Sequence, residues 1–293
     1  MSFSSELKQE LSKINNLSNK EQVKYELIGY LLTNHVIVQN RNIRYATESE
    51  YNINRFSKLL SNLQINHKIE VEGNLFVIIL KLKEINFLEF KEKSNKIRYT
   101  DLKINKMTLE DKRSIIRGTF LGSGSINNPE NSYHLEIIFS TEENLDFIIE
   151  ILKQDFNIIV KKLVNNKILL YIKEGETISN FLALIGANKG ILKFEDIRVQ
   201  KEMRSKVNRL VNCKTANMNK TINASIEQIE AIKKLQDQKK FNLLDENLKE
   251  IALLRLENPN MSLIELGKNL KKPLGKSGVN YRLKKIIEIA NSL

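Results

Sequence analysis

The sequence predicts an α+β chain in which a duplicated helix-and-strand domain precedes an all-α domain. Three observations predict this class. The length of 293 residues is enough for about two domains, each with its own core. One order of helix and strand patterns occurs twice within residues 20–186, and roughly the last fifty residues contain helical patterns only.

The composition is typical of a globular protein, with 41% hydrophobic and 28% charged residues. No apolar run approaches the roughly 18 residues that a membrane helix needs. The first residues, MSFSSELKQELSK, are polar and helical in pattern. We therefore expect no signal peptide and a cytoplasmic location.

The first copy of the unit covers residues 20–95 and follows a helical pattern that begins after Ser4 and Ser5 and continues to about residue 17. Apolar residues recur at helical spacing over about 20–32 and 50–63. Strands are expected at 36–38, 43–47, 67–71 and 75–82, and the polar turns QNRN and EGN separate the members of each pair.

The second copy covers residues 108–186. A helix is expected at 108–120, followed by the turn GSGSINNPE and a strand at 134–139. Thr141 is a suitable N-cap for a helix at 142–155, and a hairpin of 158–163 and 167–172 and a short helix at 178–185 complete the unit. The string GSGS has no third glycine and no GK[ST] ending, so we interpret it as a turn and not as a phosphate-binding loop.

Gly29 and Gly118 occupy equivalent places in the lead helices of the two copies. A glycine inside a helix costs about 1 kcal/mol relative to alanine. We therefore predict that the two lead helices contact each other closely at a pseudo-twofold axis, with the glycines at the contact. The alternative is that two unrelated glycines are merely tolerated.

Residues 191–234 are predicted to form a basic helical arm between a domain at 1–190 and a domain at 235–293. Asparagine disfavours the helix interior because its side chain competes for backbone hydrogen bonds. We expect an interruption near 212–220 because the arm has asparagines at 208, 212, 217, 219 and 223.

The last domain contains a predicted helix-turn-helix. A helical pattern at 248–256 ends at Asn258-Pro259, and Ser262 is a suitable N-cap for a short helix at 263–270. The turn KKPLGK follows, and Ser277 is expected to cap the final helix. Two short helices joined by a tight turn are the geometry that a helix-turn-helix requires.

The final helix has the composition of a DNA-recognition helix. Its apolar residues are expected to face the preceding helices: Val279, Leu283, Ile286 and Ile287. Asn280 and Arg282 are candidate base readers, and the lysines and Ser277 are expected to contact phosphates. The candidate DNA-binding residues are Ser262, Lys271, Lys272, Lys276, Ser277, Gly278, Asn280, Tyr281, Arg282, Lys284 and Lys285.

Two other interpretations of these helices stay open. One is a small helical bundle whose basic face is only solvated, since pairs of short helices are common. The other is a basic amphipathic helix on an anionic membrane, which is disfavoured because its apolar face is needed to cover the preceding helices.

The distribution of charge supports a polyanionic partner for the C-terminal part. The net charge is +12, and residues 197–293 contain 20 Lys and Arg against 10 Asp and Glu. The remaining residues carry only about +2. Cations that neutralise phosphates release condensed counterions, so the excess favours nucleic acid.

Residues suited to metal binding or covalent catalysis are few. Cys213 is the only cysteine, which excludes an intramolecular disulfide and a thiolate cluster. The histidines His35, His67 and His134 are widely separated and form no HxH or HxxxH pair. We expect no catalytic residue, no metal site and no cofactor.

Long strings of the sequence resemble the WhiA family of bacterial sporulation and cell-division regulators. The resemblance rests on RGTFLGSGSINNPENSYHLEIIFST, YIKEGETISNFLALIGA, RLVNCKTANMNKTINA and KSGVNYRLKKI, and extends from MSFSSELKQEL to the final helix. It implies a domain similar to LAGLIDADG homing endonucleases, followed by a helix-turn-helix similar to that of sigma factors.

The resemblance also implies that any nuclease activity is lost. In LAGLIDADG nucleases an acidic residue at the end of each motif helix binds the divalent metal. Alignment on Gly29 and Gly118 places Asn34 and Ser123 at these positions, and neither supplies a carboxylate. The sheet surface of such a domain can bind DNA without cutting, although a charge of about +2 argues against a strong phosphate contribution.

The sequence therefore predicts a non-enzymatic, sequence-specific DNA-binding regulator of transcription that acts in cell division and chromosome segregation. Its expected partners are double-stranded DNA at promoters and RNA polymerase or a sigma factor, with no membrane partner. The sequence does not determine the oligomeric state. Its expected location is the cytoplasm, in association with the nucleoid. The alternatives are an active LAGLIDADG-type endonuclease and a structural partner of the division or segregation machinery.

Overall fold

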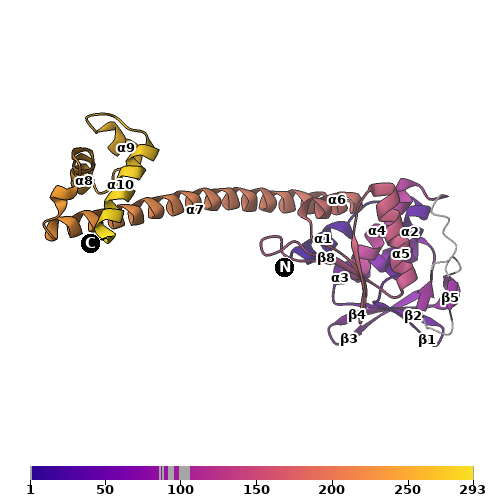
Figure 1. Cartoon of the computed structure of the whole chain (residues 1–293). Coiled ribbons are helices and arrows are strands. Elements are labelled where there is room, and N and C mark those ends of the chain that lie inside the picture. The colour runs from indigo at the N-terminus through magenta and orange to yellow at the C-terminus, as the bar shows by residue number, and fades with distance from the viewer. Residues whose placement is uncertain (1, 86, 88, 92–95, 99–105, 293) are drawn as a thin grey trace. The chain divides into compact units, whose positions relative to one another are not determined.

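The computed structural model describes residues 2–85, 87, 89–91, 96–98 and 106–292. It divides into two compact units, Met1–Glu202 and Met203–Leu293. Helix α7 (Asn188–Asp237) contributes residues to both units (Figure 1). Each unit has a core of its own, as the length of the chain predicts.

The first copy of the repeated unit contains two helices and a four-stranded antiparallel sheet. Its elements are α2 (Lys20–Leu31), β1 (Val36–Gln39), β2 (Asn42–Thr47), α3 (Glu50–Asn62), β3 (His67–Glu72) and β4 (Leu75–Lys81). The strand order is β1-β2-β4-β3, with Tyr45 opposite Ile78. These elements confirm the helices and hairpins that the sequence predicts for this copy.

The second copy has the same topology. Its elements are α4 (Leu109–Ser123), β7 (Ser125–Ile126), β8 (Leu135–Phe139), α5 (Glu142–Phe156), β9 (Lys161–Val164), β10 (Ile168–Ile172) and α6 (Gly175–Ile185). The strand order β7-β8-β10-β9 matches that of the first sheet. The prediction of one long turn over 122–130 is wrong, because α4 continues to Ser123 and residues 125–126 pair with β8.

Elements beyond the repeated helices and strands complete the first unit: α1 (Phe3–Leu11), the short 3-10 helix η1 (Leu82–Glu84), and the paired strands β5 (Glu89–Lys91) and β6 (Lys96–Arg98). The end of the predicted first copy, 20–95, contains η1 and β5, and its residues 86, 88 and 92–95 lie outside the described residues. The predicted first helix, which begins after Ser5 and continues to about residue 17, is wrong at both ends. Ser2 caps it by accepting the Ser5 N–H. It ends early because the Ile14 carbonyl and the Asn16 side chain are held by Arg55.

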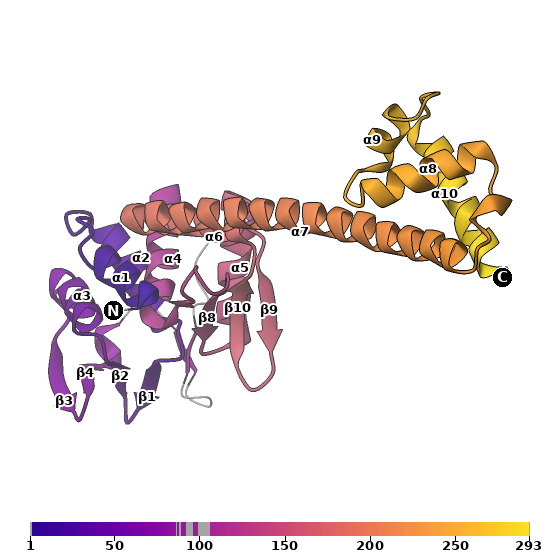
Figure 2. The same ribbon diagram turned by 90° about the vertical axis from the view of Figure 1, so that its left-hand side faces the viewer.

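Helices α2 and α4 form the centre of the first unit, side by side between the two sheets (Figure 2). A Cβ on Gly29 would lie 2.2 Å from the Ile115 carbonyl oxygen, and a Cβ on Gly118 would lie 2.0 Å from the Glu26 carbonyl oxygen. No side chain larger than hydrogen fits at either position. The predicted close contact of the lead helices through Gly29 and Gly118 is therefore confirmed.

Helix α7 is continuous over Asn188–Asp237, so the predicted interruption near 212–220 is wrong. Each asparagine costs only about 0.5 kcal/mol relative to alanine, whereas a break usually requires proline or repeated glycine. Residues 191–237 contain neither proline nor glycine. Helical continuity therefore prevails over the unfavourable propensity of the asparagines.

The second unit is helical. After α7 it contains the short 3-10 helix η4 (Phe241–Leu243), then α8 (Glu246–Glu257), α9 (Leu263–Lys268) and α10 (Lys276–Asn291). The last turns of α7 supply Ile232 and Leu235 to a core that also contains Ile251, Leu266 and Leu283. Within the described ranges, no helix combines the length and the hydropathy needed to cross a membrane.

We expect Gly29→Ala to lower the free energy of unfolding of the first unit by about 3 kcal/mol or more, because the added methyl group overlaps backbone atoms of α4 that no side-chain rotation can move. Urea unfolding followed by circular dichroism measures the change. The control is Gly278→Ala, where the nearest heavy atom is 3.5 Å from the added Cβ and helix propensity favours alanine by about 1 kcal/mol. Equal stability of the two variants would contradict the prediction.

Candidate nucleic-acid interface

The turn between α9 and α10 is tight because the backbone of the turn packs directly against a glycine of α9, Gly267. The Leu274 N–H donates to the Gly267 carbonyl oxygen at 3.0 Å, and a Cβ on Gly267 would lie 2.1 Å from the Leu274 carbonyl oxygen. At the start of α9, the Glu265 N–H donates to the Ser262 hydroxyl and the Ser262 N–H donates to the Glu265 carboxylate at 2.9 Å. Ser262 is the N-cap that the sequence predicts.

The predicted role of Ser277 as N-cap of the last helix is wrong. Helix α10 begins at Lys276 with Gly275 as its N-cap, and Gly275 provides no side-chain bond. The Val279 N–H already donates to the Gly275 carbonyl oxygen at 3.1 Å, so the first helical turn includes Ser277. The Ser277 side chain is therefore exposed at the start of the helix and has no capping bond.

One face of α10 is buried and the opposite face is exposed. Val279, Leu283, Ile286 and Ala290 are buried, and Ile287 is half-buried against them. Three of these confirm the predicted inner face, and Ile287 lies at its margin. The exposed face is centred on residues four and seven positions from Ser277, namely Tyr281 and Lys284. The ring of Tyr281 is conspicuous, since the residue is 68% exposed.

The two candidate base readers lie at the margins of this face. Asn280 and Arg282 are half-buried. The Arg282 Nη1 donates to the Asn247 carbonyl oxygen of α8 at 3.5 Å, a long and therefore weak hydrogen bond. Gly278 is also half-buried, with Leu274 beside it.

The remaining candidate residues are lysines in the turn and on α10. Lys271, Lys272, Lys276, Lys284 and Lys285 are all exposed. The Lys271 N–H donates to the Glu250 carboxylate at 2.6 Å, which attaches the turn to α8 by its backbone. Residues 258–292 contain seven Lys and Arg against two acidic residues, so the surface of the helix pair is basic.

A buried arginine positions the loop before α9. Arg255 is 1% exposed, and its Nη1 donates to the carbonyl oxygens of Pro259 at 3.3 Å and Met261 at 2.7 Å. Burial lowers the pKa of this guanidinium group. The sequence did not indicate this role, because an arginine in the last turn of a helix usually faces solvent. Its spacing from Leu248 and Ala252 on the buried face is the signal that was available.

The ends of the two motif helices have no carboxylate at the predicted metal positions. Asn34 is exposed, and its backbone N–H donates to the Ile138 carbonyl oxygen at 3.3 Å. The Ser123 hydroxyl donates to the same carbonyl oxygen at 2.6 Å and accepts the Ile138 N–H at 3.1 Å. Across the described part of the chain, no group of three or more His, Cys, Asp or Glu is arranged to hold a metal ion.

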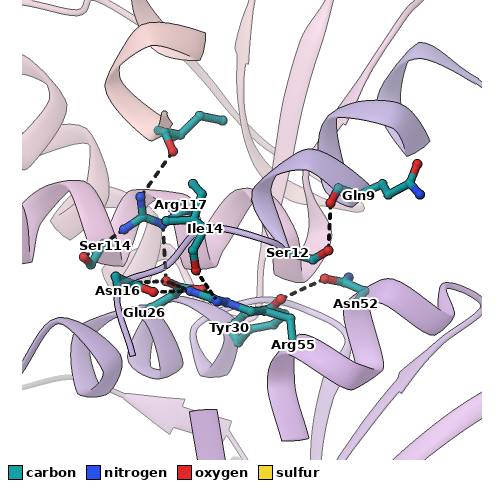
Figure 3. Close-up of polar contacts among 11 residues, drawn as sticks. Gln9, Ser12, Ile14, Asn16, Glu26, Tyr30, Asn52, Arg55, Ser114 and Arg117 are labelled. Carbon is teal, nitrogen blue, oxygen red and sulfur yellow. Dashed lines mark hydrogen bonds and ion pairs between the residues drawn. The ribbon is translucent and has the colours of Figure 1, made fainter. Parts of the chain in front are cut away.

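Glu26, an acidic residue of the first motif helix, is buried in an ion cluster (Figure 3). The Arg55 Nε donates to Glu26 Oε1 at 2.7 Å, and the Arg117 Nε donates to Oε2 at 3.2 Å. The Asn16 amide also donates to Oε2, at 2.9 Å. The Glu26 side chain has no exposed surface, so it is unavailable to an external metal ion or substrate. Glu110, by contrast, forms an exposed pair with Arg113.

The cluster fixes the charge state of Glu26. Burial alone would raise the pKa of this carboxyl group, but the hydrogen bond from Arg55 and the charges of Arg55 and Arg117 hold it below its ordinary value. The arginines come from α3 and α4, and Arg117 also donates to the Ile185 carbonyl oxygen at 3.4 Å. The cluster thus connects both copies of the repeated unit.

Both parts of the chain match known families. Residues 112–204 match the WhiA LAGLIDADG-like domain, and residues 207–290 match the WhiA C-terminal HTH domain. The chain is 37% identical to the probable cell division protein WhiA of Clostridium beijerinckii over 318 residues, covering 100% of this chain and 99% of that protein. It is 35% identical to the protein of the same name from Clostridium tetani over 317 residues, covering 100% and 98%.

Solved structures agree with these matches. The crystal structure of full-length DUF199/WhiA from Thermotoga maritima superimposes with a TM-score of 0.60 at 30% identity, covering 100% of this chain and 99% of that chain. The N-terminal LAGLIDADG domain of DUF199/WhiA gives a TM-score of 0.50 at 30% identity, covering 63% and 92%. The predicted fold, a duplicated LAGLIDADG-like domain followed by a helix-turn-helix domain, is confirmed.

We expect Glu26→Gln to destabilise the first unit by about 3–5 kcal/mol at pH 7, because two buried guanidinium groups lose their counter-charge. In the unchanged protein the pKa of Glu26 is lower when folded than when unfolded. Its contribution to stability is therefore complete above the ordinary value of about 4.3 and is lost as the pH falls. Urea unfolding between pH 7 and pH 3 measures both effects.

The matched control is Glu110→Gln, which removes an exposed carboxylate paired with Arg113. Its expected effect at pH 7 is below about 1 kcal/mol. If Glu26→Gln cost no more than this control, the cluster would not stabilise the fold.

Proposed function

The chain belongs to the WhiA family, and from this membership we propose that it is a transcription regulator of cell division that binds specific DNA sequences through α9 and α10. The observation that carries the proposal is the exposed face of α10, centred on Ser277, Tyr281 and Lys284 and surrounded by lysines. A recognition helix needs such a face, with short polar and cationic side chains toward the major groove and an apolar face against the preceding helices.

We assign DNA contact to the following residues: Ser262, Lys271, Lys272, Lys276, Ser277, Gly278, Asn280, Tyr281, Arg282, Lys284 and Lys285. The exposed lysines are suited to phosphates, which position the protein without reading sequence. Asn280 and Arg282 are suited to base edges. We infer that Arg282 exchanges its weak contact with the Asn247 carbonyl oxygen for a base.

The role in division follows from the relatives, which are named as probable cell division proteins. We propose promoter DNA as the target, with chromosome segregation among the regulated processes and the nucleoid as the site of action. RNA polymerase or a sigma factor is the proposed protein partner, because one helix-turn-helix contacts few base pairs. We propose that residues 1–190 form the LAGLIDADG-like domain, 191–234 the arm and 235–293 the DNA-binding domain, with the last turns of the arm packed into the core of the DNA-binding domain.

We propose further that the protein does not cut DNA. Metal-dependent cleavage needs carboxylates that hold a divalent ion near the scissile phosphate. Asn34 and Ser123 stand at the expected positions, and the Ser123 hydroxyl is already bonded to the backbone of β8. The Glu26 carboxylate is already paired with two buried arginines and so cannot bind a metal ion at the surface. The active endonuclease is thus the weaker of the two candidate functions.

The test of regulation is genome-wide crosslinking of the full chain and of a Tyr281→Ala/Lys284→Ala variant. We expect discrete promoter peaks for the full chain and loss of most of them in the variant, because both side chains lie on the exposed face and neither contributes to the core. Peaks that survive unchanged in a normally expressed variant would rule out α10 as the recognition helix.

We expect Arg282→Ala and Lys285→Ala to weaken DNA binding in different ways. Loss of Arg282 should cost about 1–3 kcal/mol for the preferred site and relax preference at one base position. Loss of Lys285 should weaken binding to all DNA sequences alike and lower the slope of log affinity against log salt concentration by about 1. Titrations of site and scrambled duplexes at several salt concentrations measure both, with Lys233→Ala on α7 as an exposed control. An Arg282→Ala variant with unchanged site preference would remove Arg282 from base recognition.

We expect no cleavage of supercoiled plasmid by the full chain with millimolar Mg²⁺ or Mn²⁺, because no carboxylate stands at Asn34 or Ser123. Gel electrophoresis of time points measures linear and nicked product. Product that accumulates with protein concentration and disappears with a chelator would instead establish an endonuclease.

A further inference from the structure

A segment of α7 lies beyond the helix-turn-helix core and takes no part in it. Residues 206–224 are all exposed, which makes nineteen consecutive helical positions without a packed side. From Ser225 onward the helix belongs to the core: the Ser225 hydroxyl donates to the Pro259 carbonyl oxygen at 2.5 Å, and Ile232 and Leu235 are buried. The exposed segment therefore extends from the DNA-binding domain and does not stabilise it.

This segment contains a short internal repeat. The string NRLVN at 208–212 recurs as NKTIN at 219–223, so each copy has Asn, a cation, two other residues and Asn. The copies are 11 residues apart, which is close to three helical turns, so equivalent positions share one face. The repeat face consists of Asn208, Arg209, Asn212, Asn219, Lys220 and Asn223.

The repeat face has donors and cations but no carboxylate. No Asp or Glu occurs from Met203 to Ile226, whereas five cations do: Arg204, Lys206, Arg209, Lys214 and Lys220. Within the described structure, none of the six side chains of the repeat face forms a hydrogen bond or an ion pair. A helix that is exposed all round is normally stabilised by pairs of opposite charge, and residues 207–224 contain no acidic residue with which to form them.

The repeated asparagines require an explanation from binding. Asparagine is a poor residue for a helix interior, and four of them on one exposed face add nothing to the fold. The exposed apolar residues Met203, Val207, Leu210 and Met218 lie on the opposite side of the helix. The repeat face is therefore separate from these four apolar side chains, whereas the exposed Ile222 lies at its edge.

Duplex DNA is the ligand that fits this chemistry. An asparagine amide pairs with adenine through N6 and N7, and arginine or lysine pairs with guanine or with phosphate. Because the repeat face has no carboxylates, the negatively charged phosphate backbone of DNA does not repel it. The major groove of B-DNA admits an α-helix, whereas the major groove of A-form RNA is too deep and narrow. An acidic protein partner would explain the cations but not the four asparagines.

We propose that the repeat face of α7 is a second DNA-contacting surface, which enters a major groove beside the segment bound by α10. This proposal rests on the proposed function, since it assumes that α10 binds duplex DNA. Asn208 and Asn223 are 15 residues apart, a helical length of about 22 Å. At about 3.4 Å per base pair this length matches roughly six base pairs of additional contact.

The test uses the full chain and a duplex that the chain selects from a random library. The duplex is used in a long form and in a short form, which lacks the roughly six base pairs at one end that we assign to α7. The variant replaces Asn208, Asn212, Asn219 and Asn223 with alanine, which favours the helix and so preserves the fold. We expect affinity for the long duplex to fall at least about tenfold and the hydroxyl-radical footprint to lose about six base pairs at one end. On the short duplex the variant and the unchanged chain should bind equally.

A control variant carries Val207→Ala, Leu210→Ala and Met218→Ala on the opposite face. We expect it to bind both duplexes as the unchanged chain does. An asparagine variant with unchanged affinity and footprint would overturn the second contact, as would an equal loss in the control variant. If the second contact is overturned in this way, the Tyr281→Ala/Lys284→Ala variant tests the proposed function separately. Loss of its binding to the short duplex would show that α10 binds DNA although α7 does not. If the unchanged chain selects no duplex, the proposed function and this inference both fall.

A salt titration gives an independent readout. Arg209→Ala/Lys220→Ala removes two cations of the repeat face. We expect the slope of log affinity against log salt on the long duplex to decrease by about 2, and to be unchanged on the short duplex. An unchanged slope on the long duplex would exclude phosphate contact by this face.

Discussion

The contact between the backbones of α2 and α4 is the constraint on which the first unit depends. With Gly29 and Gly118 facing each other, the helices approach until a Cβ at either position would overlap the partner's backbone. Each helix is followed by its own four-stranded sheet, so this contact also sets the distance between the two sheets. The Glu26 side chain at this contact has no exposed surface, and its carboxylate is bonded by Arg55 and Arg117. The close helix contact and the buried ion cluster thus occur together at the centre of the first unit.

The same junction connects the ends of the two motif helices to the second sheet. The ends of the motif helices are occupied by structural bonds, because the Ser123 hydroxyl and the Asn34 N–H both bind the Ile138 carbonyl oxygen of β8. The domain keeps the two sheets and the central helices, and its ionisable interior serves stability.

In the second unit, the geometry of the helix pair depends on two residues that do not touch the exposed face of α10. Gly267 lets the turn return onto α9, and Arg255 holds the carbonyl groups of the preceding loop. These contacts orient α10 so that Ser277, Tyr281 and Lys284 face outward. Continuous with this core, α7 carries the asparagine repeat, so both DNA-contacting surfaces that we propose belong to one unit.

The sequence by itself determined the features that depend on local periodicity and on composition. It predicted the duplicated unit, the glycine contact, the Ser262 cap and the basic helix-turn-helix, because each leaves a pattern within a few turns of chain. Only the tertiary structure decided the burial of Glu26 and Arg255, the start of α10, the short strand β7 and the continuity of α7. These depend on partners distant in the chain. A buried charge, for example, is tolerated only where opposite charges or carbonyl groups converge on it.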